Sequence, residues 1–343
     1  MSLTSHLDNP QSPVSQFLRT HFPHLRSVQA QFRAGLAGKP TIRPVGPVPW
    51  GTIGHAFDYR LRYSFEVTPS NKLVAFLGMR KASEGTSGFR IGQDAVEAMG
   101  EPPWPHLGSS FFTSLDQTIT RIDPARRHLA PEDERTLNRY CVVLGWFEEI
   151  YRAGLERSPL LQLPKEARAE DALALVESSW IDDLGALSEV FYLAMGNLLD
   201  HPTVLNPIFA GSRDVHGADA DLIVDDCLID VKTTVNPSLD MKSLYQVIGY
   251  TLLDYVDAYR VGRVGFYFAR QGTLITWPVD ELLATVSGGK RQDLGAWRAA
   301  FRENIRATRL SRFPPPNVDG EPARSVGVLV DLGDTNRRGG MVT

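Results

Sequence analysis

The segment Gly217–Thr234, with the sequence GADADLIVDDCLIDVKTT, constrains the fold more than any other part of the chain. Two short aliphatic runs, Leu222–Val224 and Cys227–Ile229, flank the pair Asp225-Asp226. Aliphatic and β-branched runs on either side of two turn-forming residues are typical of a β-hairpin. With the turn centred on the Asp pair, Asp221 lies opposite Asp230, and Asp219 lies opposite Lys232.

Because side chains alternate between the faces of a strand, this register predicts that Asp219, Asp221, Asp230 and Lys232 share one face. Like charges directly opposed in a sheet repel each other, with β-carbons only about 4.5–5.5 Å apart. A cation between the carboxylates removes that repulsion, and carboxylate oxygens are ligands that Mg²⁺ prefers. A neighbouring Lys can activate a water molecule or stabilise charge on a phosphate. The alternative is a surface hairpin with a polar outer face.

The order carboxylate, strand, turn, strand and Asp-x-Lys resembles the core of the PD-(D/E)XK nuclease superfamily. Asp221 matches the first acidic position, Asp230 and Lys232 match the (D/E)xK motif, and the literal Pro-Asp is absent. Gln246-x-x-x-Tyr250, on the next expected helix, resembles a further motif of the RecB-like branch.

This resemblance implies an α/β (α+β) fold with a restriction-endonuclease-like αβββαβ core. It also implies a Mg²⁺- or Mn²⁺-dependent deoxyribonuclease in which Asp221 and Asp230 hold the metal, with Asp219 as a possible accessory ligand. Lys232 then positions or deprotonates the attacking water, and Gln246 orients Lys232 or that water. Tyr250 contacts DNA or packs.

Glu189 is the only charged residue between Leu184 and Leu199, in a segment that we expect to form a buried helix before the first strand. A buried carboxylate is costly unless it is paired or bound to metal. Many PD-(D/E)XK folds take a Glu metal ligand from a helix at this place, so the resemblance implies that role for Glu189. The alternative is a pair with an Arg from the N-terminal half.

The segment Gly54–Asp58 resembles the Gly-x-x-x-His helix of RecB-type nucleases, with Asp58 at the His position. This makes Asp58 a possible accessory site residue and gives His55 a weaker claim. The simpler interpretation is that Asp58 and Arg62 form a surface ion pair four residues apart on a helix.

Composition excludes several classes of protein. Two cysteines, Cys141 and Cys227, are too few for a disulfide framework or a four-cysteine iron–sulfur cluster. The net charge of −4 argues against indiscriminate binding of polyanions. The sequence has no transmembrane run and no secretory signal, so we expect a cytoplasmic protein without membrane contact. It also has no Walker A loop, so any ATPase or helicase that works with it is expected to be a separate subunit.

Sequence pattern and the resemblance together divide the chain into four expected regions. Hydrophobic periodicity and composition predict a disordered arm (1–12), an α-helical region (13–178) with a break at Pro23 and a long loop at 83–108, and a loosely ordered tail (311–343). The resemblance implies that residues 179–310 form the nuclease core. Within the core we expect strands at 204–210, 264–269 and 273–277 besides the hairpin, and a helix at 238–259.

The functional prediction is a metal-dependent nuclease that hydrolyses DNA phosphodiester bonds. By analogy with the superfamily, it would act in phage defence, restriction or DNA repair, where a defence-system subunit is a possible partner. The alternative is a catalytically inactive nuclease-like module that binds nucleic acid or a partner protein. A small-molecule hydrolase is disfavoured because no Gly-x-Ser-x-Gly or HExxH motif is present.

Overall fold

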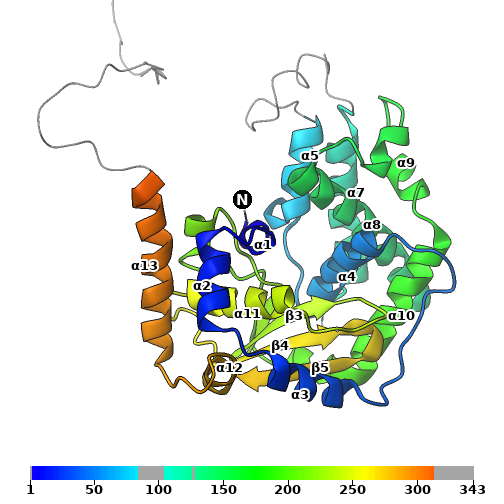
Figure 1. Cartoon of the computed structure of the whole chain (residues 1–343). Coiled ribbons are helices and arrows are strands. Elements are labelled where there is room, and N and C mark those ends of the chain that lie inside the picture. Colours follow the sequence, from blue (N-terminus) through cyan, green and yellow to red (C-terminus); the bar gives the residue numbers. More distant parts are fainter. Residues whose placement is uncertain (1, 84–103, 126–127, 313–343) are drawn as a thin grey trace, which may run out of the picture.

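The computed structural model describes residues 2–83, 104–125 and 128–312. It shows a mixed α/β protein in which a central sheet lies between two groups of helices (Figure 1). The strands are β1 (Thr203–Leu205), β2 (Leu222–Val224), β3 (Cys227–Lys232), β4 (Arg263–Phe268) and β5 (Thr273–Pro278). Within the described ranges, no helix is long and apolar enough to cross a membrane.

The sheet has the order β1-β2-β3-β4-β5. All neighbouring pairs are antiparallel except β3 and β4, which are parallel because helix α11 (Met241–Leu253) connects them. The predicted hairpin register is confirmed: Leu222 pairs with Ile229 and Val224 pairs with Cys227. In the turn, Asp225 adopts a φ of 51°, a left-handed conformation that Asp tolerates better than most residues.

One face of the sheet packs against a group of helices that we call the lobe. The lobe comprises α4 (Trp50–Phe65), α5 (Val74–Ser83), α7 (Leu107–Ile122), α8 (Pro131–Ala153), α9 (Ala169–Ala174) and α10 (Ser178–Met195). Its buried core includes Leu222, Val224 and Ile229 of the sheet. At the crossing of α5 and α8, a Cβ on Gly78 would lie 1.7 Å from the carbonyl oxygen of Phe147, so glycine permits this close approach.

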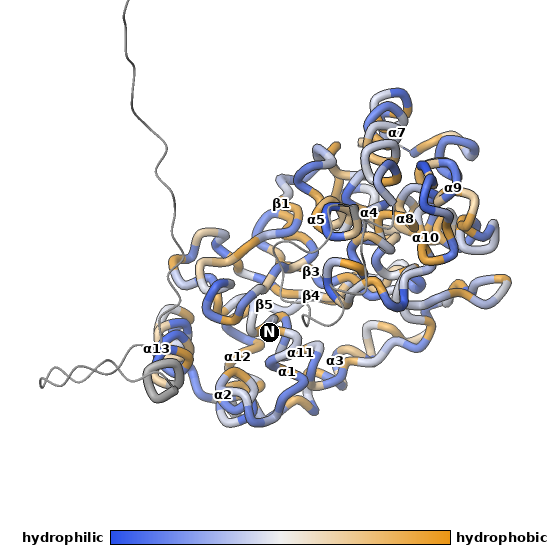
Figure 2. Tube along the Cα trace, turned by 90° about the horizontal axis from the view of Figure 1, so that it is seen from above, coloured by the Kyte–Doolittle hydropathy of each residue, from blue (hydrophilic) through white to orange (hydrophobic). Residues whose placement is uncertain are grey.

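The opposite face packs against a second group of helices, which we call the base. The base comprises α1 (Leu3–Asp8), α2 (Pro13–His21), α3 (Arg26–Leu36), α11, α12 (Val279–Val286) and α13 (Leu294–Arg312). Its core contains Ile223, Leu228 and Phe266 of the sheet. Seen from above, lobe and base lie on opposite sides of β3, β4 and β5 (Figure 2).

One expected region is wrong. Residues 1–12 are not a disordered arm, because α1 buries Leu3 and Leu7 and packs on α11 beside Gly249. The described part of region 13–178 is helical, as expected, but α2 and α3 of that region pack in the base with the strands. The predicted break at Pro23 is confirmed between α2 and α3. Most of the expected loop at 83–108 and nearly all of the tail at 311–343 lie outside the described residues.

A buried ion pair joins the lobe to the turn between β4 and β5. Arg270 donates two hydrogen bonds of 2.7 Å to the carboxylate of Asp183 on α10, and both side chains are almost wholly buried. The Nε of Arg270 also donates to the carbonyl oxygen of Thr233, just after β3, at 2.6 Å. This pair therefore ties α10 to the end of the strand that carries Asp230 and Lys232.

We predict that Asp183→Asn lowers the free energy of unfolding by about 3–5 kcal/mol, because it leaves the buried Arg270 charge without its partner. Urea unfolding at neutral pH measures this change. The matched control is Asp182→Asn, the preceding residue on α10, whose carboxylate forms an exposed ion pair with Arg135. That exposed pair contributes only about 0–1 kcal/mol. An equal decrease in the two variants would contradict the assigned role of Asp183.

Candidate functional site

Asp221, Asp230 and Lys232 lie on the face of the sheet that is turned toward α11. Their neighbours Ile223 and Leu228 belong to the base core, and side chains two residues apart on a strand share a face. The Oδ2 of Asp221 accepts a hydrogen bond of 2.7 Å from the backbone N–H of Val231, which holds the Asp221 carboxylate against β3. The side chains of the predicted site are therefore brought together.

Lys232 is paired with the deepest carboxylate of this group. Its Nζ lies 2.6 Å from the Oδ2 of Asp230, and the side chain of Asp230 is only 4% exposed whereas that of Lys232 is 30% exposed. Apart from this ion pair, no described residue hydrogen-bonds the buried Oδ2 of Asp230. The ammonium group thus lies between a buried carboxylate and the more open side of the site.

Helix α4 adds a third carboxylate, Asp58. It forms the expected ion pair with Arg62, at 2.6 Å, but this is not a surface pair, since the two side chains are only 19% and 12% exposed. The charge of Asp58 acts on Asp221, so the two carboxyl groups lie in one electrostatic cluster. We call Asp58, Asp221, Asp230 and Lys232 the aspartate cluster.

The pKa values of the three carboxyl groups in this cluster are all raised. Burial is the largest cause in each case. For Asp221, the charges of Asp230 and Asp58 add to burial and place its pKa well above the ordinary value. Arg62 opposes the shift at Asp58, and Lys232 opposes it at Asp230. The positive charges of Arg62 and Lys232 are therefore too few to offset burial and keep the pKa values of these carboxyl groups at their ordinary level.

Lys232 keeps its proton in this environment. Burial lowers its pKa, but the charge of Asp230, the hydrogen bond to Asp230 and the charge of Asp221 together outweigh burial, so the pKa is raised. The cluster therefore holds Lys232 as an ammonium ion, which stabilises negative charge and donates hydrogen bonds.

Gln246 and Tyr250 lie on α11 next to the cluster. The Nε2 of Gln246 donates a hydrogen bond of 2.8 Å to the hydroxyl of Tyr250. Tyr250 is 4% exposed and stacks on Phe209 with 5.6 Å between ring centroids. Of its two predicted roles, DNA contact or packing, the structure shows packing. Burial, and beyond it the charges of Asp230, Asp221 and Asp219, raise the pKa of Tyr250, which places its hydroxyl beside the aspartate cluster.

The other two predicted site residues have different surroundings. The Oδ2 of Asp219 accepts a hydrogen bond of 3.2 Å from Arg152 of α8, rather than facing Lys232. Glu189 is not the buried carboxylate that we expected: its side chain is 55% exposed and lies 2.9 Å from the Nε2 of His128. The buried carboxylate of α10 is Asp183. Asp183 is paired with an Arg, which was the alternative considered for Glu189, but Arg270 follows β4 and does not come from the N-terminal half.

Sequence reasoning missed a set of lobe residues next to the cluster. Glu148 of α8 is buried, accepts a hydrogen bond of 2.6 Å from the hydroxyl of Tyr59 and accepts one of 2.7 Å from Arg152. Burial raises the pKa of Glu148, but Arg152 and Tyr59 outweigh it, so the pKa is lowered. The sequence signal that could have identified Glu148 is its place directly after the apolar run 141–147, where a carboxylate is expected to be buried and paired.

Two arginines of the lobe reach residues on the sheet side of the site. Arg152 bridges Glu148 and Asp219, and the Nη2 of Arg62 donates a hydrogen bond of 3.3 Å to Asn206, directly after β1. The lobe thus contacts residues that flank β1 and β2, namely Asn206 and Asp219.

His55, near Asp58 on α4, lies close to a carboxylate of α8. Its Nδ1 is 3.6 Å from Glu149, a contact too long for a hydrogen bond. The Glu149 carboxylate raises the pKa of His55 despite burial. The structure therefore gives His55 a partner in the lobe.

The chemistry of the donor set fits a hard divalent cation. Asp221 and Asp230 offer carboxylate oxygens, and burial first, then the charges of Asp230 and Asp58, raise the pKa of Asp221. Among the described residues, no three acidic, His or Cys side chains converge to hold a metal ion by themselves. Mg²⁺ does not need such a cage, because it commonly takes one or two carboxylates and completes its shell with water and phosphate oxygens.

Comparison with known proteins adds no relative: no family model, no curated protein and no solved structure matches the chain.

The raised pKa of Asp221 predicts that metal-free protein loses stability as pH rises. The unfolded chain releases this proton near pH 3.8 and the folded chain releases it at higher pH, so the folded state binds more protons in between. We predict that Asp221→Asn removes this loss. Its gain in stability over the wild type is near zero at pH 4 and increases toward pH 8.

Thermal melts in EDTA from pH 4 to pH 8 measure this difference. The matched control is Asp225→Asn in the turn of the same hairpin, where the carboxylate is 40% exposed and Asn tolerates the left-handed backbone. A constant difference between wild type and Asp221→Asn across this range would show that Asp221 titrates normally.

Proposed function

We propose that this protein is a divalent-metal-dependent nuclease that hydrolyses phosphodiester bonds of DNA. The observation that carries the proposal is the pair of carboxylates, Asp221 and Asp230, held on one face of a β-hairpin with the ammonium of Lys232 2.6 Å from Asp230. This is the arrangement of the (D/E)xK motif. The order of elements, α10-β1-β2-β3-α11-β4, agrees with the αβββαβ core of the PD-(D/E)XK superfamily.

In this proposal Asp221 and Asp230 hold Mg²⁺ or Mn²⁺. When bound, the metal supplies Lewis-acid stabilisation of the phosphate and lowers the pKa of a bound water. Lys232 has its proton in the metal-free cluster, so its first role is to donate a hydrogen bond to a phosphate oxygen or to the water. Gln246, at the edge of the cluster, orients that water with the help of Tyr250.

Asp58 and Arg62 have a supporting role in the same proposal. The ion pair of 2.6 Å fixes the Asp58 carboxylate close to Asp221, where its negative charge strengthens the attraction for a cation. Glu189 has no part in it, because its side chain is exposed and pairs with His128.

The rival function is a catalytically inactive module that binds nucleic acid or a partner protein. One observation favours it: two arginines of the lobe are already bonded to residues near the site, Arg152 to Asp219 and Arg62 to Asn206. Because Asp221, Asp230 and Lys232 are all present, we regard catalysis as the better account.

We predict that wild-type protein cleaves DNA in Mg²⁺ or Mn²⁺ and not in EDTA. Lys232→Ala should lower that rate by roughly two orders of magnitude or more, the scale of losing a charge-stabilising or proton-transferring group. Incubation with linear, circular and single-stranded DNA, followed on gels, gives both rates and distinguishes end-directed from internal cleavage.

The matched control is Lys290→Ala, an exposed lysine in the loop before α13, which should leave the rate unchanged. Circular dichroism checks that Lys232→Ala is folded. A folded wild-type protein that binds DNA but cuts none of the substrates in either metal would favour the inactive module. Cleavage by Lys232→Ala at the wild-type rate would contradict the assigned role of Lys232.

A further inference from the structure

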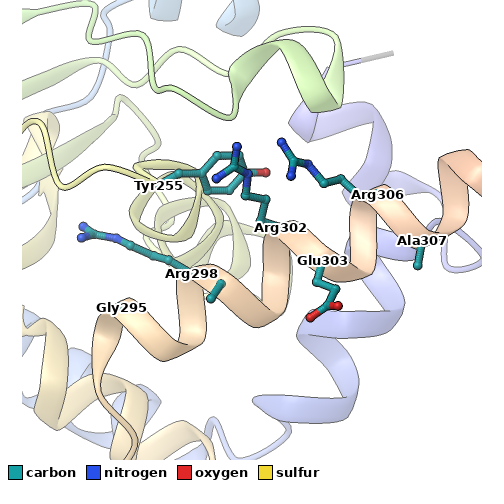
Figure 3. Close-up of a pocket in the computed structure, with 8 residues that line it drawn as sticks. Tyr255, Gly295, Arg298, Arg302, Glu303, Arg306 and Ala307 are labelled. Atoms are coloured by element: carbon teal, nitrogen blue, oxygen red, sulfur yellow. The ribbon is translucent and has the colours of Figure 1, made fainter.

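A second feature of the molecule, outside the aspartate cluster, is a pocket along α13. Its volume is about 420 Å³, and it is lined by one residue after α11 and by one face of α13: Tyr255, Gly295, Arg298, Ala299, Arg302, Glu303, Arg306 and Ala307. Arg298, Arg302 and Arg306 follow each other at intervals of four residues, so they lie in one row on the helix. Figure 3 shows this row beside the ring of Tyr255.

The first arginine of the row is neutralised. The Nη1 of Arg298 donates a hydrogen bond of 2.7 Å to Asp257, and its Nη2 lies 3.6 Å from Asp254. Its Nε donates to the carbonyl oxygen of Thr251 near the end of α11, at 3.1 Å. Arg298 therefore fixes α13 against α11.

The other two arginines are not neutralised in this way. Within the described residues, neither Arg302 nor Arg306 forms an ion pair, and the Nε of Arg302 is buried without a hydrogen-bond partner. The guanidinium of Arg302 lies 5.0 Å from the centroid of the Tyr255 ring, which holds it in place.

Among the described acidic groups around the pocket, Asp254 and Asp257 pair with Arg298, and none forms an ion pair with Arg302 or Arg306. Glu303 points away from the Arg302 and Arg306 guanidinium groups (Figure 3). Asp214 lies near the hydroxyl of Tyr255, where burial first and then the Asp214 charge raise the pKa of Tyr255, while Arg302 and Arg306 lower it. Asp214, Arg302 and Arg306 thus all act on the hydroxyl of Tyr255.

Guanidinium groups held at a concave surface bind phosphate oxygens well, because their planar N–H groups match the anion. We propose that Arg302 and Arg306 bind a phosphate group of a nucleic-acid strand in this pocket. Tyr255 of the pocket follows the end of α11, the helix that also carries Gln246 and Tyr250 beside the aspartate cluster. This phosphate site rests on the proposed nuclease function only in taking the bound strand to be DNA.

The test measures binding without cleavage. A fluorescently labelled single-stranded 20-mer is titrated with protein in EDTA, and its anisotropy is followed at several salt concentrations. We expect Arg302→Gln/Arg306→Gln to bind roughly tenfold or more weakly, since removing each hydrogen bond to a charged group has about that effect or more. The slope of log K against log salt should fall by roughly 0.7 for each phosphate that the variant no longer neutralises.

The matched control is Arg33→Gln, an exposed arginine on α3 that removes the same charge from another surface. Arg306→Gln alone, at an exposed position, keeps the test valid if the double variant unfolds. Inorganic pyrophosphate is added as a competitor, to test whether a free phosphate compound binds the same pocket as the strand. If pyrophosphate displaces the strand from wild type but not from Arg306→Gln, the two ligands share this pocket.

Strand binding that is equal in wild type, Arg306→Gln and the double variant overturns the proposal, even if wild type still cleaves DNA in Mg²⁺. So does a wild-type protein that binds no strand. Binding that depends on Arg302 and Arg306 in a protein that cuts nothing supports the pocket and contradicts the proposed nuclease, so the two failures can be told apart.

Discussion

The arrangement of the site depends on the burial of several carboxyl groups at one place. Asp230 is nearly inaccessible, Asp221 is held against β3 by the N–H of Val231, and Asp58 adds its charge from α4. Burial raises the pKa of all three, repulsion adds to it at Asp221, and Lys232 and Arg62 oppose it. Such an arrangement costs stability in the metal-free protein, and a divalent cation is the ligand that best offsets that cost.

The two hydrophobic cores explain how the chain supports this cost. Lobe and base each bury one face of the sheet, so the β2–β3 hairpin is fixed from both sides and its register cannot slip without moving every apolar side chain to the wrong face. The Asp183–Arg270 pair then anchors the end of β3 through Thr233. The positions of Asp230 and Lys232 are set by this packing.

The sequence predicted the parts of the site that depend on local order. Strand alternation and a two-residue turn were sufficient to put Asp221 beside Asp230 and Lys232, and the Gln246–Tyr250 pair followed from helical spacing. Contacts between distant segments were not predictable: Glu148 reaches Tyr59 because α8 packs against α4, and Arg152 of the same helix reaches Asp219. The burial of Glu189 was predicted wrongly because a helix that is apolar nearly all round gives no pattern from which its solvent-facing side can be deduced. In α10 the buried carboxylate is Asp183, and Glu189 is exposed. The early helix α1 was missed because six residues carry too little periodicity.

Whether the aspartate cluster holds a divalent cation is tested most directly by Mn²⁺ binding followed by electron paramagnetic resonance. The signal of free Mn²⁺ falls as the ion binds, and no substrate is needed. We predict a saturable site in wild type that Asp230→Asn abolishes and Asp225→Asn retains. Equal Mn²⁺ binding by wild type and a folded Asp230→Asn, or no binding by wild type, would contradict a metal site in this cluster.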